Sequence, residues 1–420
     1  MPQSRDRPRA GFGGKGGRPG RFGRAHALQK EFPGDGDPVE RIRQALPAAL
    51  SRRYFNNGSC GPLPVECQRA IAEEADRELR QGRVGSQAAA RAAALHGQAR
   101  AALSRVLHAP EGTVALTHHT TEGLNIAILG HEFSPGDEIL TTSVEHIGAL
   151  APLFSLKERR GVRITALEVG ADPAGLADLV AAAIGPRTRM MVLSHVAYAT
   201  GAVLPVKRIA EICRRRNVLV VVDGAQAAGA LPVDVVELGV DAYAIPGQKW
   251  LYGPEGTGAL YVRRELIPTL VPPESGYASM ARWDEAALTH AFHPDARRFE
   301  VGSVYLPALA GLVASLRWLE TEVGLAWVHA RVAALASAVG ERIAALPGAR
   351  VLTPPGAAGL VVFNLDAVDP QAAVAALEAQ GILIRWVPRP RALRVSVAAH
   401  NDAADVEALL MALAGLCARR

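Results

Sequence analysis

One apolar run that ends in an acidic residue constrains the fold of this chain more than any other feature. Five aliphatic residues, Val218–Val222, precede Asp223, and Gly224–Gln226 follows. An uninterrupted run of this kind is typical of a parallel strand buried on both faces, and the carboxyl ends of such strands form a ligand crevice. We therefore expect the side chain of Asp223 to face a cleft.

A second strand delivers a lysine to the same edge of the predicted sheet. The alternating run Asp241–Ile245 is followed by a Pro246-Gly247 turn, and Lys249 comes two residues later. Because neighbouring parallel strands end at one edge, an acid and an amine meet at the crevice. An aspartate facing a protonated ring nitrogen and a lysine able to form a Schiff base are the two protein groups that pyridoxal phosphate (PLP) requires.

These segments, with Gly253–Gly258 after them, resemble the class V branch of the fold-type I PLP enzymes. That branch contains cysteine desulfurases, cysteine and cystine C–S lyases, isopenicillin N epimerase-like proteins and some aminotransferases. The resemblance implies that Lys249 forms the Schiff base, that Asp223 pairs with the pyridinium nitrogen and that Gln226 hydrogen-bonds the ring hydroxyl. Taken singly, the aspartate is also typical of a turn cap and the lysine of a solvated loop cation.

The order of elements predicts an α/β fold. Strands and helices alternate from Thr113 to Val262, which favours a parallel sheet with helices on both faces. The resemblance implies a large PLP-binding domain, 66–295, with a mostly parallel seven-stranded sheet. It also implies a smaller α+β domain built from 38–65 and 296–420. A chain of 420 residues is long enough for two such domains.

The first 33 residues differ in composition from the rest. Residues 1–30 hold eight lysines and arginines against one acidic residue, Asp6, whereas the remaining chain has a net charge of about −2. The basic, glycine-rich segment Gly11–Arg18 cannot bury enough apolar surface to fold, so we predict a disordered tail over 1–33. Similar segments bind single-stranded nucleic acid, so a non-catalytic nucleic-acid-binding protein is the least favoured alternative.

No part of the sequence predicts secretion, a membrane span or a metal site. The start lacks the apolar core of a signal peptide, and no charge-free run of about twenty apolar residues occurs. The four cysteines, Cys60, Cys67, Cys213 and Cys417, have no metal-ligand spacing. We therefore expect a cytoplasmic protein with reduced thiols.

A run of hydroxyl residues at a predicted helix start provides an anion site. The strand Thr113–Thr117 leads into His118–Gly123, which turns directly into an apolar helix. Free backbone N–H groups and the helix dipole favour negative charge at such a position. The segment resembles the family's phosphate turn, which implies that Thr120 and Thr121 bind the cofactor phosphate. His119 stands where a small residue is usual, and its role stays open.

Three further cofactor contacts follow from the resemblance. It implies that His146 stacks on the pyridine ring and relays protons, as a second catalytic residue beside Lys249. Gln248 joins the cofactor-binding residues. The segment Arg298–Ser303 resembles the one that reaches the cofactor phosphate of a partner subunit, with Ser303 as the hydroxyl. This arrangement implies a homodimer with shared active sites.

Two arginines nine residues apart indicate an amino acid substrate. A planar guanidinium binds a carboxylate through two parallel hydrogen bonds. Arg394 matches the family's carboxylate arginine, and Arg385 the second arginine of the cysteine and cystine lyases. Asn57 and Tyr198 are the other predicted substrate contacts. Ala199 stands where lyase-like relatives have an asparagine, which leaves the substrate open.

The loop between these arginines bears on the reaction. A cysteine desulfurase carries its persulfide-forming cysteine there, whereas this chain has Pro388–Arg391 and no thiol. Without a thiolate near the substrate sulfur, persulfide transfer to the enzyme is disfavoured. We therefore predict a C–S lyase that acts by β-elimination on cysteine, cystine or an S-conjugate. An aminotransferase or an isopenicillin N epimerase-like epimerase stays open, because all three begin by removing the Cα proton.

Overall fold

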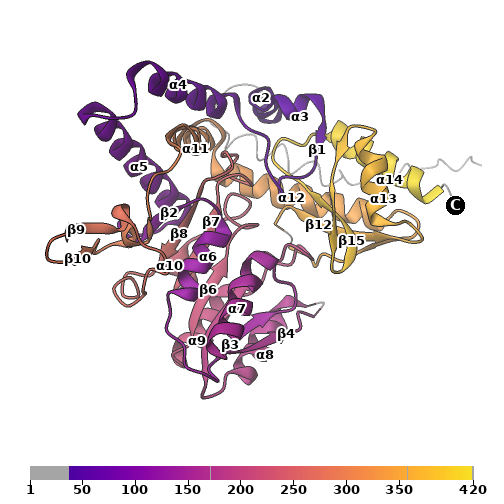
Figure 1. Ribbon diagram of the computed structural model, residues 1–420. Helices are drawn as coiled ribbons and strands as arrows, with labels where there is room; N and C mark the ends of the chain where they lie inside the picture. The colour runs from indigo at the N-terminus through magenta and orange to yellow at the C-terminus, as the bar shows by residue number, and fades with distance from the viewer. Residues whose placement is uncertain (1–36, 171, 357, 419–420) are drawn as a thin grey trace, which may run out of the picture.

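A seven-stranded sheet forms the centre of the larger part of the molecule (Figure 1). The structure, a computed structural model, describes residues 37–170, 172–356 and 358–418. The predicted basic tail, 1–33, lies outside them. The sheet contains β2 (Val114–Thr117), β3 (Glu138–Thr142), β4 (Arg163–Leu167), β5 (Thr188–Ser194), β6 (Leu219–Asp223), β7 (Ala242–Pro246) and β8 (Gly258–Val262).

The strand order is β2-β8-β7-β6-β5-β3-β4. The antiparallel strand β8 pairs with β2 and β7, and all other neighbours in this sheet are parallel. The prediction of a mostly parallel, seven-stranded sheet is therefore confirmed. Strands β5, β6 and β7 end in Ser194, Asp223 and Pro246, which brings these residues to one edge.

Both faces of this sheet are buried, which explains the unbroken apolar run of β6. Val221 belongs to an apolar cluster with residues of α6 (Thr120–Leu129) and α7 (Ile147–Arg160). Its neighbour Val222 points to the opposite face and joins a second cluster. Successive side chains of a strand alternate between faces, so a doubly covered strand has no solvent-facing position left for a polar residue. The helices on the second face include α5 (Ser86–Leu107), α8 (Leu176–Ala183), α9 (Val206–Arg215) and α10 (Val235–Leu238).

A helical layer connects the two parts of the molecule. Helix α11 (Leu306–Trp318) packs against α4 (Val65–Gln81) and α5, and a π-helical turn, Leu319–Val323, leads into α12 (Leu325–Ala344). Leu309, Trp318 and Val328 belong to the apolar cluster on the second face of the central sheet. The predicted domain boundaries at 66, 295 and 296 stay a prediction. Among the described residues no single helix is long and apolar enough to cross a membrane. The segments Leu306–Val323 and Leu325–Ala344 together have the length and composition of a span, but the chain bends by 81° between them.

The smaller part contains a four-stranded antiparallel sheet in the order β11-β12-β15-β14. Its strands are β11 (Ala349–Val351), β12 (Leu360–Leu365), β14 (Arg385–Pro388) and β15 (Arg391–Ser396), and its helices are α13 (Pro370–Glu378) and α14 (Ala403–Ala418). The N-terminal helices α2 (Pro38–Ala45) and α3 (Pro47–Ser51) lie beside it (Figure 1), because β1 (Arg53–Tyr54) pairs in parallel with β13 (Ile382–Leu383). The two ends of the described chain therefore meet in one unit.

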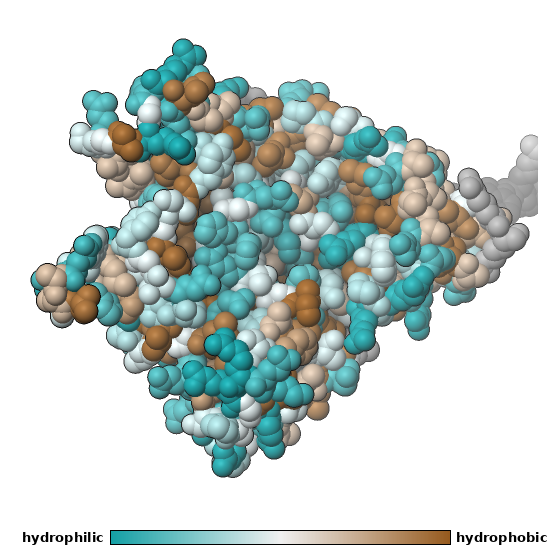
Figure 2. Space-filling view, viewed as in Figure 1, coloured by the Kyte–Doolittle hydropathy of each residue, from teal (hydrophilic) through white to brown (hydrophobic). Residues whose placement is uncertain are grey.

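A two-stranded hairpin projects from the larger part. It consists of β9 (Met280–Asp284) and β10 (Thr289–Phe292) and lies at the left in Figure 1. Figure 2 shows apolar side chains on this projection, and Trp283 and Leu288 are 56% and 88% exposed. A single chain leaves these side chains uncovered.

Candidate functional site

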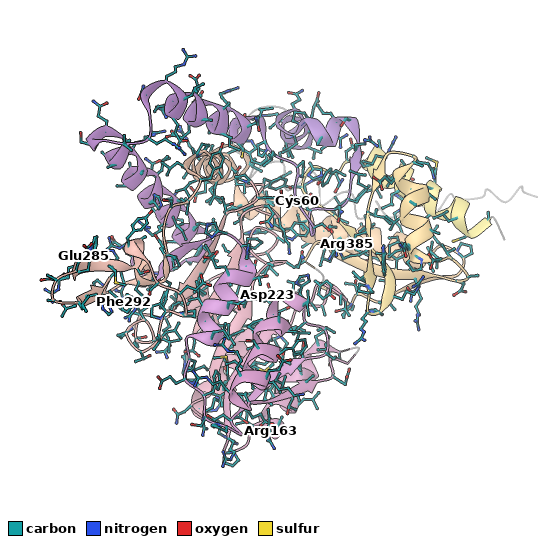
Figure 3. All side chains as sticks on the ribbon, viewed as in Figure 1. Cys60, Arg163, Asp223, Glu285, Phe292 and Arg385 are labelled. Atoms are coloured by element: carbon teal, nitrogen blue, oxygen red, sulfur yellow. The ribbon has the colours of Figure 1, made fainter. Side chains whose placement is uncertain are left out.

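A cavity of about 240 Å³ lies where the carboxyl-terminal edge of the central sheet faces the smaller sheet. Figure 3 shows Asp223 in the larger part and Arg385 on the smaller one, with Cys60 above them. Most of the residues predicted from the sequence line this cavity: Thr120, Thr121, His146, Tyr198, Asp223, Gln226, Gln248, Lys249, Arg385 and Arg394, together with His119. Residues from six separate stretches of the chain thus line one cavity.

Asp223 and Lys249 line the cavity together. Asp223 is 6% exposed, and its Oδ1 accepts a hydrogen bond of 2.9 Å from the backbone N of Ala225. Burial lowers the pKa of Lys249 to about 8, and the charge of Asp223 partly opposes this shift. At neutral pH the amine is therefore far closer to its nucleophilic form than an exposed lysine is.

A close backbone contact holds the lysine in place. The N–H of Gly61 donates to the carbonyl of Gln248 at 2.7 Å. A Cβ at position 61 would lie 2.3 Å from the carbonyl oxygen of Lys249, so only glycine fits there. The loop that precedes α4 therefore packs closely against the backbone of Gln248 and Lys249.

The threonine end of the cavity has the form of an anion site. Helix α6 begins at Thr120, and His119 is its N-cap, with Nδ1 accepting a 3.1 Å hydrogen bond from the N–H of Glu122. The buried Thr120 Oγ1 has no hydrogen-bond partner among the described residues, and the same holds for Gln248 Oε1. A hydroxyl buried without a partner at a helix N-terminus fits a phosphate group. His119 thus caps helix α6 and also lines the cavity.

The imidazole of His146 is oriented by two neighbours. Its Nδ1 accepts a 3.1 Å hydrogen bond from the N–H of Gly148, so the proton of the neutral ring lies on Nε2. Tyr198 meets the ring edge-on, with 5.0 Å between ring centroids and an interplanar angle of 88°. Burial, followed by the charge of Lys249, lowers the pKa of His146. The cavity therefore presents a fixed, neutral imidazole, as stacking on a planar cofactor requires.

The amide of Gln226 is held at both ends. Its Nε2 donates to the carbonyl of Gly58 at 2.8 Å, and its Oε1 accepts from Trp250 Nε1 at 3.0 Å. One hydrogen of Nε2 remains for a ligand. Gln226 is thus a rigid donor in the cavity wall, which suits the predicted contact with a ring oxygen.

Arg394 is a buried cation without an acidic partner among the described residues. It is 1% exposed, its Nε has no hydrogen-bond partner, and its two terminal nitrogens contact the Tyr198 carbonyl at 3.3 Å and Ser59 Oγ at 3.2 Å. Burial and then the neighbouring Arg385 lower its pKa to about 9, so it stays charged at neutral pH. A charge buried in this way requires an anion, and a ligand carboxylate fits it.

Arg385 faces the same point from the next strand. It is the register partner of Arg394 across β14 and β15, and its Nη1 donates to Ser59 Oγ at 3.2 Å. Two guanidinium groups thus share one hydroxyl. Ser59 was not predicted from the sequence, although it lies two residues after the predicted substrate contact Asn57.

Two predicted site residues lie outside the cavity lining. Asn57 is fully buried, and the cavity is lined instead by its neighbours Gly58 and Ser59. Ser303 is exposed, its Oγ contacts Tyr277 Oη at 2.6 Å, and it is not among the residues that line the cavity of its own chain. Its assignment to a partner's phosphate stays a prediction.

Further lining residues carried no sequence signal strong enough to select them. Ser194 and Pro246 end strands β5 and β7, and Val196 and Ala225 follow such strand ends. The rule that ligands bind at the carboxyl ends of parallel strands identifies these positions once the strand order is known. Among the described residues no group of three or more His, Cys, Asp or Glu side chains suits a metal ion.

Comparison with known proteins agrees with this geometry. The family model described as aminotransferase class-V matches residues 53–409. A probable cysteine desulfurase of Pseudomonas aeruginosa is 35% identical over 334 residues, which cover 75% of this chain and 81% of that protein. The cysteine desulfurase CsdA of Escherichia coli is 30% identical, covering 77% of this chain and 84% of that protein.

Solved structures show the same likeness. The cystine C–S lyase C-DES, in complex with its reaction product cysteine persulfide, has a TM-score of 0.85 and 31% identity, covering 88% of this chain and 99% of that chain. The Escherichia coli CsdA structure has a TM-score of 0.80 and 26% identity, covering 90% of this chain and 98% of that chain. The predicted fold class is therefore confirmed.

Proposed function

We propose, from the premise that this chain belongs to the class-V aminotransferase family, that it is a PLP-dependent C–S lyase. Its substrate would be cysteine, cystine or a related S-conjugate. The observation that carries the proposal is one cavity that holds an acid, a lysine of lowered pKa and a buried arginine without an acidic partner among the described residues. These groups suit a ring nitrogen, an aldehyde and an amino acid carboxylate, respectively.

The residues present fit the cofactor. Asp223 would pair with the ring nitrogen, Gln226 with the ring oxygen, and Thr120 and Thr121 with the phosphate, for which the unpartnered Thr120 hydroxyl is the supporting observation. Lys249 would hold the aldehyde. When bound, PLP acts as an electron sink that makes the Cα–H bond of an amino acid acidic.

The reaction itself follows from the positions of three side chains. Arg394 would hold the substrate carboxylate and thereby orient the Cα–H bond, and Lys249 Nζ would accept the Cα proton. The Cβ–S bond then breaks, and the sulfur leaves with its electron pair as a thiolate or persulfide. The remaining fragment yields pyruvate and ammonia on hydrolysis. His146, neutral and with its proton on Nε2, would cover the ring.

The cysteines support a lyase rather than a desulfurase. The hairpin between Arg385 and Arg394 contains no thiol, and no cysteine lines the cavity of the described residues. Cys60 lies within electrostatic range of Lys249, but burial, and next the charge of Glu255, raise the pKa of its thiol. A thiol of raised pKa is a poor sulfur acceptor. The sulfur would thus leave the site as a small-molecule thiolate or persulfide and would not be transferred to a cysteine of the enzyme.

A product assay tests this function. The full chain, reconstituted with PLP, is incubated with cystine, cysteine and a panel of non-sulfur amino acids, and pyruvate, ammonia and protein-bound persulfide are measured. We expect pyruvate and ammonia in equal amounts from a sulfur amino acid and no persulfide on the protein. Conversion of PLP to its pyridoxamine form would indicate an aminotransferase instead, and racemisation with solvent deuterium uptake an epimerase.

The lowered pKa of Lys249 predicts how cofactor capture depends on pH. Only the neutral amine attacks an aldehyde, and its fraction rises with pH until the pKa of about 8 is passed. We expect the rate constant for PLP capture to rise about tenfold from about pH 6 to about pH 7 and to level off above about pH 8. Stopped-flow absorption measures it. A rate that keeps rising tenfold per pH unit up to about pH 10 would indicate a lysine of ordinary pKa.

We also infer a homodimer in the cytoplasm. Trp283 and Leu288 are exposed on the projecting hairpin, and Ser303 is exposed beside Tyr277, which precedes β9. These exposed residues support a second copy of the chain as the partner that covers them. All four cysteines are unpaired, which is typical of a reducing compartment. Light scattering on the full chain is expected to give the mass of two chains. A monomer with full activity would contradict the shared site.

A further inference from the structure

Glu145 is a buried acid beside the site that has no role in the mechanism above. It lies between β3 and α7, directly before His146, and is 5% exposed. Ser194 N donates to its Oε1 at 3.0 Å, Thr142 Oγ1 lies 2.5 Å from Oε1, and Ser194 Oγ lies 2.5 Å from Oε2. Among the described residues, the hydrogen-bond partners of its carboxyl group are therefore two hydroxyl groups and one backbone amide.

The other buried acids in the described part of the chain show what is unusual here. Glu74, Asp137, Glu138, Asp241 and Asp405 each form an ion pair with an arginine. Glu145 and Asp223 are the buried acids for which no such pair occurs among the described residues. Asp223 has the nearby charge of Lys249 in the same cavity. In the part of the chain that the structure describes, no cation forms an ion pair with Glu145, and burying an ionised carboxylate without one is costly.

Ser194 joins the two acids. It lines the cavity at the end of β5, and in the sheet it is the register partner of Asp223 on β6. Its hydroxyl contacts Glu145, which follows β3, the neighbour of β5 on the side away from β6. Two carboxyl groups on either side of one residue do not both ionise readily, because the second negative charge is repelled by the first.

The geometry points to Glu145 as a positioning residue that is held as a neutral carboxylic acid. In that form its O–H donates to Ser194 Oγ, so that the hydroxyl hydrogen of Ser194 is released toward the cavity on the side of Asp223. The negative charge then stays on Asp223, where the proposed function needs it to face the ring nitrogen. Glu145 also anchors the backbone that precedes His146.

The electrostatics of the site agree with this assignment. Burial, with a smaller contribution from the charge of Asp223, raises the pKa of Glu145 to about 7 against the opposing hydrogen bonds of Ser194 and Thr142. Asp223 is the charged group that faces it across Ser194. His146, its neighbour in the chain, has a lowered pKa and contributes no positive charge at neutral pH.

Infrared spectroscopy tests the protonation state without the cofactor. The difference spectrum between wild-type apoprotein and Glu145→Gln is expected to contain the C=O stretch of one protonated carboxyl group at about pH 6. This band should disappear at about pH 9. The band reports the protonation state of Glu145 alone, so it would be observed even if the proposed lyase function were wrong. A failure of this inference is therefore distinguishable from a failure of the proposed function. Absence of the band at about pH 6 would overturn the inference.

A matched pair of variants gives a second readout. Glutamine has the donor and acceptor pattern of a neutral acid, so Glu145→Gln is expected to keep the melting temperature and to bind PLP within about threefold of wild type. Glu138→Gln is the control, because Glu138 is a buried, charged acid on β3, the strand that precedes Glu145, and is paired with Arg163 and bonded to Thr165 and Thr188. It should melt at a clearly lower temperature. An equal loss in both variants would show that Glu145 is charged.

The link through Ser194 is tested by a double-variant cycle. Ser194→Ala and Glu145→Ala are each expected to weaken PLP binding about tenfold, and the double variant should be no weaker than either single one. If Glu145→Gln binds PLP about as well as wild type while Glu145→Ala does not, the side chain acts by donating a hydrogen bond and not only by packing. Additive losses would mean that Glu145 does not act through Ser194.

Discussion

Replacement of Lys249 by alanine is expected to lower pyruvate formation on the order of 10⁴-fold, the scale of losing a general base. The variant also loses the amine that condenses with the cofactor aldehyde, so bound PLP should be removed by dialysis and no longer become fixed to the protein by borohydride. Burial disfavours the charged form of Lys249, as its pKa of about 8 shows. Its removal should therefore leave the melting temperature of the apoprotein unchanged or raised.

The control for this variant is Lys207→Ala. Lys207 lies on the surface of α9, where its Nζ pairs with Glu237 at 2.9 Å, and we expect unchanged activity. Pyruvate formation and borohydride fixation are measured on both proteins. Retention of covalent PLP by the Lys249 variant would refute the assignment of this residue and with it the proposed chemistry.

Replacement of Arg394 by alanine is expected to give the second largest effect. A carboxylate that loses its buried guanidinium partner costs about 3 kcal/mol, which corresponds to about 10²-fold in kcat/KM. The stability of the apoprotein, by contrast, should increase in this variant. Because Arg394 is 1% exposed and has no acidic partner among the described residues, its removal relieves a buried charge and should raise the melting temperature.

Arg391→Ala is the matched control on the same strand. Arg391 is exposed at the start of β15 and pairs with Asp369, away from the cavity. We expect its kinetics to be unchanged. Arg394→Lys should recover part of the activity, since it retains the charge but not the two parallel donors. A loss of activity accompanied by an equal loss of stability in Arg394→Ala would indicate a purely structural role.

Local sequence patterns predicted individual strands of the central sheet and its parallel character, whereas the number of strands came from the family resemblance. The aliphatic run before Asp223 predicts a strand buried on both faces, and both clusters found around it agree. The hydroxyl run at Thr120 predicts a helix start, and α6 begins there. The Asp223 and Lys249 positions follow from the same rule, because each comes at or just after a strand end. These features depend on residues close together in the sequence and on the geometry of one strand or one helix turn.

The other features of the site depend on contacts between segments that are far apart in the sequence. Ser59 meets Arg385 and Arg394, which are 326 and 335 residues away, and no local pattern predicts such a contact. Asn57 was expected at the cavity, but it turns into the interior and its neighbours line the wall. The pairing of Glu145 with Ser194 depends on the order of β3, β5 and β6 in the sheet.

The sequence by itself therefore determined the strands, the helix starts and the chemical groups at the sheet edge, because periodicity and backbone preferences act over a few residues. Only the tertiary structure decided which side chains share the cavity and which of the two buried acids has a cation nearby. The charge state of a buried group depends on every neighbour that packs against it, and those neighbours come from strands and loops far apart in the chain.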